Sequence, residues 1–444
     1  MKNKNWEKYI KLINKEVIPA IGCTEPIAVA YAAAKARKIL NKKPEIIDVF
    51  VSGNMLKNGM GVGVPGTGMV GLDIAAATGA LGGTADAVLE VLKSITEKDV
   101  IEGKRMMKEG RVNVKVKGDV ADLYIEVICR SGNDNARVII EDTHINIVLV
   151  ELNNKVLFKK DSNENKDSVK EVVSEENDDD VYLSVDSVYD FAVNAPLEDI
   201  KFIREKDKLN EEISKEGLSN DYGLKVGRTI EKYINKGLLA DDIIISAIKR
   251  TSGGADARMA GCMMSVMSNS GSGNQGITAS MPVIAVGEKL GASEEKITRA
   301  LALSNLMAIH IHNYLSRLAA LCGVVVAGTA ASCGITYLLD GDVDAVKRAI
   351  NNMLGNITGL VCDGAKTSCA LKVSTAVNAA VISAMLAIEN IGISEKEGII
   401  DKNVENTIRN VGNIGSYGMK QTDKMMLDIM VAKQKGEQNI EETA

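Results

Sequence analysis

The sequence contains few aromatic residues, few histidines and few prolines. Aromatic side chains make up 3% of the 444 residues, and there are one tryptophan, three histidines and six prolines. A core without large aromatic side chains must be filled by Ala, Val, Ile, Leu and Met, because protein interiors are close-packed. Together with 40 glycines, this composition favours helices packed closely through small residues over a β-sandwich.

Positive charge is also scarce. The chain has 53 basic and 59 acidic residues, which gives a net charge of −6. We find no basic patch interleaved with aromatic residues, which is the pattern typical of nucleic-acid binding. A net negative chain has no general attraction to an anionic membrane surface either. We therefore expect no nucleic-acid partner.

One uncharged run must be tested as a membrane span. Residues 318–339 carry no charge, and this length is sufficient to cross a bilayer. The run is, however, rich in Gly, Ala, Ser, Thr and Cys, and Arg317 and Asp340 bound it without an aromatic belt. We expect a buried central helix pair, broken at Gly334, and no membrane association.

The cysteines are odd in number and widely spaced. Seven cysteines show no dense disulfide framework. The first 21 residues form an amphipathic pattern with charges throughout, which differs from the uncharged centre of a signal peptide. We therefore expect a cytoplasmic protein, since a reducing compartment leaves cysteines available for metal.

The periodicity of the sequence changes twice along the chain. Residues 111–160 alternate with period two between turn signals, which predicts an antiparallel β meander, and an acidic segment without periodicity follows at 161–180. From Tyr182 onward the pattern is helical. We predict an α+β fold in which a large, mostly helical core (1–95 and 183–444) carries an inserted antiparallel β subdomain (96–182).

Three cysteines stand out by their neighbours. Residues 362–369 read Cys-Asp-Gly-Ala-Lys-Thr-Ser-Cys, and Cys322 lies upstream beside a glycine. Converging thiolates select zinc, copper(I) or iron–sulfur clusters, and three protein ligands leave one metal position open for chemistry. The alternative is that these cysteines are small core residues. Cys333 competes with Cys322 for the third position.

A polar run at 267–276, Met-Ser-Asn-Ser-Gly-Ser-Gly-Asn-Gln-Gly, precedes a helix expected to begin near Ile277. Hydroxyls, amides and free backbone N–H groups at a helix N-terminus can hold a carboxylate or a phosphate. A flexible loop is the alternative, but the run separates two apolar helical segments. We therefore expect a carboxylate pocket.

Further residues are candidates for the same site. Cys23 directly precedes a helix expected to start at Thr24, where the helix dipole should lower the pKa of a thiol. Of the histidines, His310 and His312 could orient a substrate or act as acid or base, whereas we expect His144 on a surface strand. Asp256 and Arg258 could form a structural pair or contact substrate.

Several of these motifs together resemble the L-cysteine desulfidase family, which is related to the α-chain of iron–sulfur L-serine dehydratases. They are Gly-Cys-Thr-Glu-Pro at 22–26, Ser-Gly-Asn at 52–54, the polar run at 268–276 and the two-cysteine segment at 362–369. The resemblance spans nearly the whole chain and is weakest at 160–182.

The resemblance implies a [4Fe–4S] cluster held by three cysteines, with one iron free to bind substrate. The implied residues are the cluster ligands Cys322, Cys362 and Cys369, the base Cys23, and the substrate contacts Ser52, Asn54, Ser270, Ser272 and Asn274. We add His310 to the substrate contacts.

The implied activity is β-elimination of L-cysteine, which yields pyruvate, ammonia and sulfide. Dehydration of L-serine or L-threonine at the same cluster is the alternative, because the leaving group would contact iron rather than a diagnostic side chain. A non-catalytic iron–sulfur sensor or scaffold is an alternative of another class, and a Schiff base on Lys366 a minor one. The sequence leaves open whether a homo-oligomer forms.

Overall fold

Most of the chain is helical, as the sequence predicts. The structure is a computed structural model, and it describes residues 4–160, 182–315 and 319–441. The expected acidic segment at 161–180 lies outside these ranges. The helices are α1 (Lys4–Glu16), α2 (Thr24–Leu40), α3 (Gly53–Gly59), α4 (Leu72–Gly82), α5 (Glu97–Lys108), α6 (Val185–Asn194), α7 (Leu197–Ser219), α8 (Val226–Asn235), α9 (Ile243–Met259), α10 (Gly273–Lys289), α11 (Glu294–His312), α12 (Gly323–Leu338), α13 (Val343–Ile357), α14 (Cys369–Ile388), α15 (Val404–Asn413) and α16 (Lys420–Glu441).

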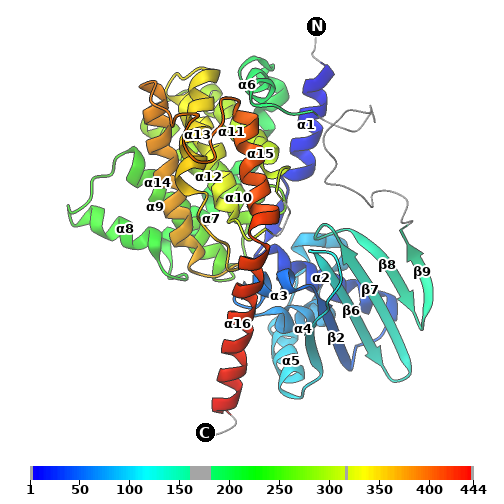
Figure 1. The fold of residues 1–444 in the computed structure, drawn as a ribbon. Coiled ribbons are helices and arrows are strands. Elements are labelled where there is room, and N and C mark those ends of the chain that lie inside the picture. Colours follow the sequence, from blue (N-terminus) through cyan, green and yellow to red (C-terminus); the bar gives the residue numbers. More distant parts are fainter. Residues whose placement is uncertain (1–3, 161–181, 316–318, 442–444) are drawn as a thin grey trace.

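One half of the molecule is built on a six-stranded sheet (Figure 1). Its spatial order is β5 (Val112–Val116), β2 (Ile46–Val51), β6 (Tyr124–Ser131), β7 (Asp134–Glu141), β8 (Ile147–Leu152) and β9 (Lys155–Lys159). Apolar residues of α2 and α4 pack on the buried face of this sheet. The α+β class predicted from the sequence is confirmed.

The sheet differs from the predicted meander in one respect. Strand β2 lies inside it, pairing parallel with β5 and antiparallel with β6, so the sheet is mixed. The sheet therefore draws a strand from residues 1–95 and is not confined to 96–182. The division of the chain at 95 and 182 stays a prediction.

The other half is a helical bundle around α12. Helices α10, α11, α13 and α14 pack against it, and 14 of its 16 residues are buried. Gly334 does not break α12, contrary to our expectation. A side-chain carbon there would lie 2.8 Å from the backbone oxygen of Ala300 in α11, so the glycine permits close packing of the two helices.

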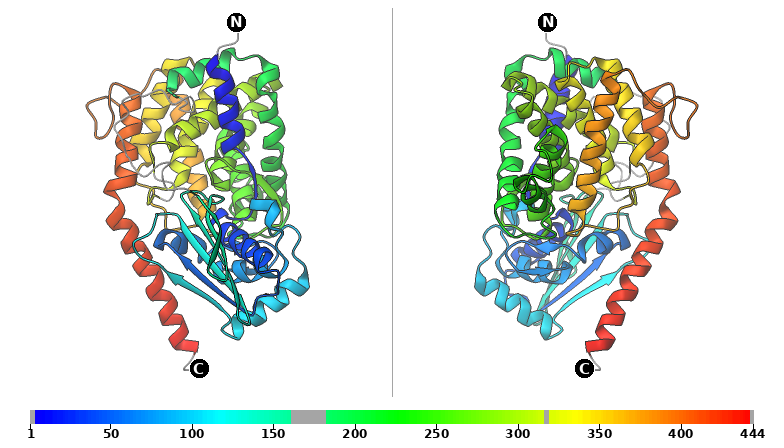
Figure 2. Two further views of the ribbon diagram at one scale, coloured as in Figure 1. Left: turned by 90° about the vertical axis from the view of Figure 1, so that its right-hand side faces the viewer. Right: turned by 90° about the vertical axis from the view of Figure 1, so that its left-hand side faces the viewer.

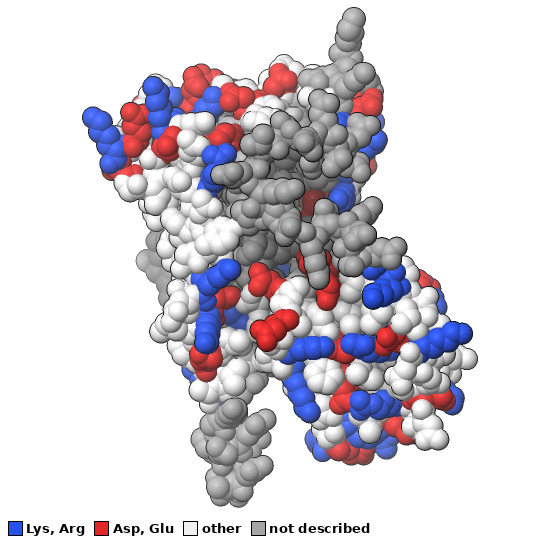
Figure 3. Space-filling view, turned by 45° about the vertical axis from the view of Figure 1, so that its right-hand side comes forward, with Lys and Arg blue, Asp and Glu red and all other residues white. Residues whose placement is uncertain are grey.

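One described helix, α14, is long and apolar enough to cross a membrane by length and composition alone, and half of its most apolar window is buried against the rest of the protein. Helix α12, which covers most of the uncharged run, is shorter than this test requires. The described charges of the face shown in Figure 3 are of both signs and are interspersed.

Two of the contacts between the halves involve the ends of the chain. Strand β1 (Pro19–Ile21) pairs with β10 (Ser265–Met267), which leads into the polar run. The last helix, α16, descends from the bundle past α3 (Figures 1 and 2). There the fully buried ammonium group of Lys57 in α3 pairs with Asp423 in α16.

Candidate functional site

A cavity lies where the two halves meet, and it encloses about 120 Å³. Its walls contain the N-terminus of α2, the end of α3 and the turn before β8 from the sheet half, and α9, the polar run and the cysteine segments from the helical half. The residues discussed below that line it are Cys23, Glu25, Asn58, His144, Arg258, Ser270, Ser272, Asn274, Gln275, His312, Cys322, Cys362 and Cys369.

The structure brings the three predicted cluster ligands to this one cavity. An isolated bridge between Leu321 and Val361 holds two of their segments side by side. Within it the amide of Cys322 donates to Leu360 (3.0 Å) and the amide of Cys362 donates to Ala320 (2.6 Å). Cys369 starts α14.

Cys333 does not compete for the third position. It lies in the middle of α12, fully buried, and its thiol donates to the backbone oxygen of Thr329 at 3.3 Å. Cys322, by contrast, is the N-cap of the same helix and faces the cavity. Eleven residues further along α12, Cys333 packs in the core of the helical half.

The surroundings favour the ionised form of one of the three cysteines, Cys362, whereas burial raises the pKa of Cys369. A hydrogen bond from Cys322 lowers the pKa of Cys362, burial opposes this, and the positive charges of Lys57 and Lys372 add to the lowering. The pKa of Cys322 is raised, first by the same hydrogen bond and then by burial. Because α12 and α14 begin at the cavity, the positive ends of both helix dipoles also point toward it.

Backbone packing fixes the loop between Cys362 and Cys369. Gly364 has a φ of +91°, and a side-chain carbon there would lie 2.1 Å from the backbone oxygen of Lys57. Lys372 donates to the backbone oxygen of Val361 at 2.9 Å and pairs with Asp363. The loop is thus held against α3 on one side and α14 on the other.

Cys23 forms a buried pair with Glu25. Its thiol donates to the Glu25 carboxylate at 2.8 Å, and both side chains are less than 10% exposed. Burial raises the pKa of the Cys23 thiol well above its usual range, and the Glu25 charge raises it further. Our expectation of a lowered pKa at Cys23 is therefore wrong, because burial and a carboxylate outweigh the helix dipole.

Glu25 is held as a carboxylate by its neighbours. Burial alone would raise its pKa, but His144, the hydrogen bond from Cys23 and the Arg258 charge together lower it. His144 Nε2 lies 4.0 Å from Glu25 Oε1, and the Asn58 amide donates to the same oxygen at 3.2 Å. Cys23 thus donates a hydrogen bond to an ionised carboxylate, and the directions of the two pKa shifts keep the proton on Cys23 in the resting site.

The polar run forms one wall of the cavity, as expected. Ser270, Ser272 and Asn274 all line it. Ser270 adopts a left-handed backbone conformation (φ 49°) and its hydroxyl donates to Asn269 Oδ1 at 2.9 Å. Ser272 caps α10 by accepting from the Gln275 amide N–H at 3.4 Å.

Arg258 supplies a positive charge to the cavity. Its Nε donates to the backbone oxygen of Gly22 at 3.1 Å, and its Nη2 is buried without a hydrogen-bond partner among the described residues. It forms no pair with Asp256, whose Oδ2 accepts from the Gly227 amide at 3.1 Å. The structural pair considered for Asp256 and Arg258 is therefore not formed, and the substrate contact stays a prediction.

Three predicted substrate contacts lie away from the lining. Ser52 caps α3, accepting from Met55 N at 3.3 Å and donating to the Asp122 backbone oxygen at 2.6 Å. Asn54 is half-buried in the same helix. His310 Nε2 lies 2.8 Å from Glu405 Oε2 in α15. The structure does not bring these three side chains to the cavity.

Three polar lining residues were not singled out from the sequence, and they are Glu25, Asn58 and His144. Gln275, which also lines the cavity, belongs to the predicted polar run. We expected His144 on a surface strand, but it lies in the buried turn between β7 and β8 and is 6% exposed. For Glu25 the nearby Cys23 was an available signal, whereas nothing local in the sequence marks Asn58 or His144.

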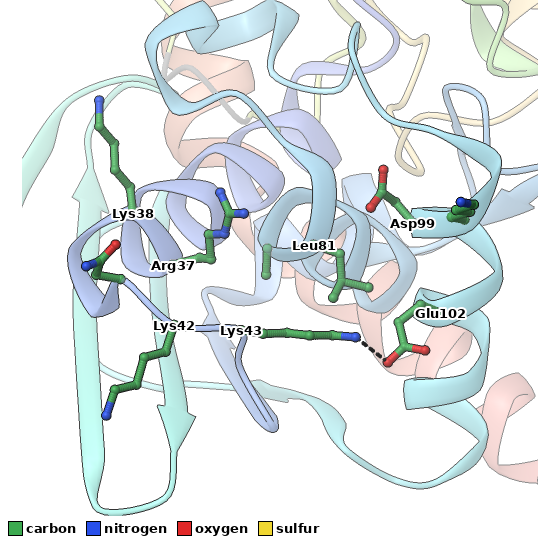
Figure 4. Close-up of a pocket in the computed structure, with 10 residues that line it drawn as sticks. Arg37, Lys38, Lys42, Lys43, Leu81, Asp99 and Glu102 are labelled. Carbon is green, nitrogen blue, oxygen red and sulfur yellow. Dashed lines mark hydrogen bonds and ion pairs between the residues drawn. The ribbon is translucent and has the colours of Figure 1, made fainter.

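A larger cavity, of about 630 Å³, lies elsewhere, between the end of α2 and α5 (Figure 4). Lys38, Lys42 and Lys43 reach it, and Lys43 is paired with Glu102 at 2.9 Å. These lysines are exposed, and two of them, Lys38 and Lys42, bind Asp86 and Asp134. It contains none of the predicted site residues.

The donor set at the smaller cavity fits an iron–sulfur cluster. Thiols are the ligands that such clusters require, and the neighbours of Cys362 favour its ionised form. Among the described residues, no three His, Cys, Asp or Glu side chains lie close enough to share a single metal ion. A cluster would contain several iron atoms, so its three protein ligands would not need to converge on one metal ion.

The chain was next compared with known proteins. A family model described as the serine dehydratase alpha chain matches residues 86–428. The chain belongs to this family. The resemblance inferred from the motifs is thereby confirmed, and the serine dehydratase alpha chain family makes this a lyase-type enzyme of an iron–sulfur-associated group.

Relatives of similar length carry the name "UPF0597 protein". The one from Oleidesulfovibrio alaskensis is 48% identical over 433 residues, covering 98% of this chain and 100% of the relative. One from Bacteroides fragilis is 48% identical over 434 residues, with the same coverage. One from Chromobacterium violaceum is 45% identical over 428 residues, covering 96% and 98%.

Proposed function

We propose that this lyase β-eliminates L-cysteine in the cytoplasm, using a [4Fe–4S] cluster held by Cys322, Cys362 and Cys369. The balanced reaction is L-cysteine + H₂O → pyruvate + NH₃ + H₂S. The observation that carries the proposal is the single cavity that holds three thiols, a Cys23–Glu25 pair and an unpartnered arginine nitrogen. When bound, the cluster would supply Lewis acidity toward the leaving group.

The chain's own residues would bind and deprotonate the substrate. The free Nη2 of Arg258 can donate to the substrate carboxylate. Cys23 can pass its proton to Glu25, and the resulting thiolate can take the α-proton, since the two side chains already share a hydrogen bond. The enamine that remains after elimination tautomerises and hydrolyses without further protein groups.

Dehydration of L-serine or L-threonine is the second candidate. The match to the serine dehydratase alpha chain favours it. The same side chains would serve, because only the leaving group changes from sulfide to hydroxide.

An anaerobic assay tests the proposal. Protein purified and reconstituted under argon is given L-cysteine, L-serine or L-threonine, and the products measured are sulfide and the 2-oxo acid, which is pyruvate from the first two substrates and 2-oxobutyrate from L-threonine. We expect L-cysteine to give the highest kcat/KM. Faster pyruvate release from L-serine would assign the second candidate, and no turnover of any of the three would leave only the non-catalytic sensor or scaffold.

A substitution separates chemistry from cluster binding. Cys23→Ala should keep the iron and sulfide content and lower kcat by about 10²- to 10⁴-fold, which is the usual contribution of a positioned acid–base group. Cys129→Ala is the matched control, because Cys129 is buried on β6 away from the cavity. A Cys23→Ala enzyme of unchanged rate would remove Cys23 from the mechanism.

A further inference from the structure

Three amide side chains in the cavity wall present oxygen atoms without partners among the described residues, and they belong to Asn58, Asn274 and Gln275. Asn58 is 7% exposed and Gln275 is 1% exposed. Asn58 Oδ1 and Gln275 Oε1 are both buried and accept no hydrogen bond from any described residue. A buried acceptor left unsatisfied costs roughly 1–3 kcal/mol, so three in one cavity call for a donor that occupies the cavity.

The orientation of the Asn58 amide is fixed by its partner. Its Nδ2 donates to Glu25 Oε1 at 3.2 Å, and a carboxylate that is ionised can only accept. If the amide group were rotated by 180°, Asn58 Oδ1 would face Glu25 Oε1, and neither oxygen could donate a hydrogen bond. Asn58 Oδ1 is therefore the atom that remains for a ligand.

The orientation of the Gln275 amide follows from a chain of three hydrogen bonds. Asn269 Nδ2 donates to the backbone oxygen of Asn305 at 3.1 Å, and a backbone oxygen can only accept. Asn269 Oδ1 must then face the other way, where it accepts from Ser270 and, at 3.4 Å, from Gln275 Nε2. Gln275 Oε1 is left facing away from this network.

The free oxygen of Gln275 lies at the cysteine end of the cavity. A side-chain carbon added to Gly323, the first residue of α12, would stand 3.2 Å from Gln275 Oε1. Asn58 comes from the opposite half of the molecule, at the end of α3. The two acceptors thus approach the cavity from both of its walls.

We infer that Asn58 Oδ1 and Gln275 Oε1 bind the α-ammonium group of the substrate, so that the cavity selects α-amino acids over the corresponding carboxylic acids. An ammonium group offers three donors, and hydrogen bonds to a charged group are the stronger kind. Arg258 presents its free nitrogen to the same cavity. A cation beside two acceptors matches the carboxylate and ammonium groups that an α-amino acid carries on one carbon.

This inference rests on the proposed function, because it names how that site recognises its substrate. It makes Asn58 and Gln275 specificity-determining residues. A site built around a donor on its ligand should reject an analogue without that donor, since its acceptors would stay unsatisfied.

The test is binding without turnover. L-Alanine has both charged groups but no leaving group, and propionate lacks only the ammonium group. Isothermal titration calorimetry on the anaerobically purified protein should show L-alanine binding at least about 10-fold more tightly than propionate. Equal affinities would overturn the inference, because ordered water would then satisfy the two amides.

Variants locate the effect. Gln275→Met and Asn58→Leu should each weaken L-alanine about 10- to 100-fold and leave propionate unchanged. Arg258→Met should weaken both ligands, and Gln421→Met, at an exposed position of α16, should weaken neither. If Gln275→Met and Asn58→Leu bind both ligands as the wild type does, the assignment is wrong.

These outcomes are separate from those of the activity assay. If L-cysteine is turned over but L-alanine and propionate bind equally, the proposed function stands and this inference falls. If no substrate is turned over but the binding pattern holds, the ammonium site stands and the proposed reaction falls.

Discussion

The residues at the cavity owe their properties to position more than to type. Cys322 and Cys333 lie on one helix, yet only the first, at the helix N-terminus, reaches the cavity. His310 and His312 are two residues apart, and the helix turns His310 toward Glu405 while His312 lines the cavity. A residue's place within its helix therefore decides whether it can take part in chemistry.

Cluster binding should depend on Cys362 and not on Cys333. Cys362→Ala removes a thiol that its neighbours favour as a thiolate, so we expect loss of the visible absorbance and of most of the iron after anaerobic reconstitution. Cys333→Ala, in the core of α12, is the matched control and should keep both. Full iron content in Cys362→Ala would contradict the ligand assignment.

Much of this site could be predicted from the sequence, and the rest has a physical reason for being hidden. The cysteines and the polar run stand out because their composition is unusual. Asn58 and His144 have ordinary neighbours in sequence, and they reach Glu25 only through the packing of α3 and of the turn before β8. No local pattern encodes such a contact.

At the scale of elements, the periodicity of the sequence predicted whether a segment is a helix or a strand. It did not predict which other elements that segment contacts. The alternation at 111–160 correctly indicated β5 to β9. It could not indicate that β2 enters the same sheet, because pairing of Val49 with Val127 joins residues far apart in sequence. Similarly, the helical pattern from Tyr182 onward indicated that α16 is a helix but not that it contacts α3.

Helix α16 should contribute measurably to stability through one buried ion pair. Asp423→Asn leaves Lys57, which has no exposed surface, without its counter-charge. We expect the free energy of unfolding to fall by about 3 kcal/mol, because breaking one side of a buried pair strands a charge. Denaturant unfolding of the anaerobic protein measures this.

Asp428→Asn is the control on the same helix, since Asp428 is exposed. The double variant Lys57→Met/Asp423→Leu should recover much of the loss, because it removes both charges together. An Asp423→Asn protein as stable as the wild type would show that Lys57 is neutral or otherwise compensated.

For the whole molecule, stability should depend on pH through a buried carboxyl group. Burial raises the pKa of Asp207, in α7, to about 7, and it is 1% exposed. An unfolded chain ionises this group near pH 4. Between these pH values the folded state holds the extra proton, so stability from this group is present at low pH and is lost as pH rises through 7.

Comparison with Asp207→Asn isolates this contribution. The unfolding free energy of the wild type minus that of the variant should fall by between about 1 and 4 kcal/mol from pH 4 to pH 8. Denaturant unfolding at several pH values provides the measurement, with Asp119→Asn at an exposed turn as control. A difference that does not vary with pH would mean that Asp207 titrates normally.

The pairing of the first and last parts of the chain also has a consequence for biosynthesis. Lys57 and Asp423 are separated by 366 residues, and at about 5–20 residues per second the ribosome needs roughly 20 to 70 s to add them. Throughout that time the nascent chain carries a lysine whose final partner has not been made. The buried ion pair, and with it the contact of α16 with α3, can therefore form only after Asp423 has been synthesised.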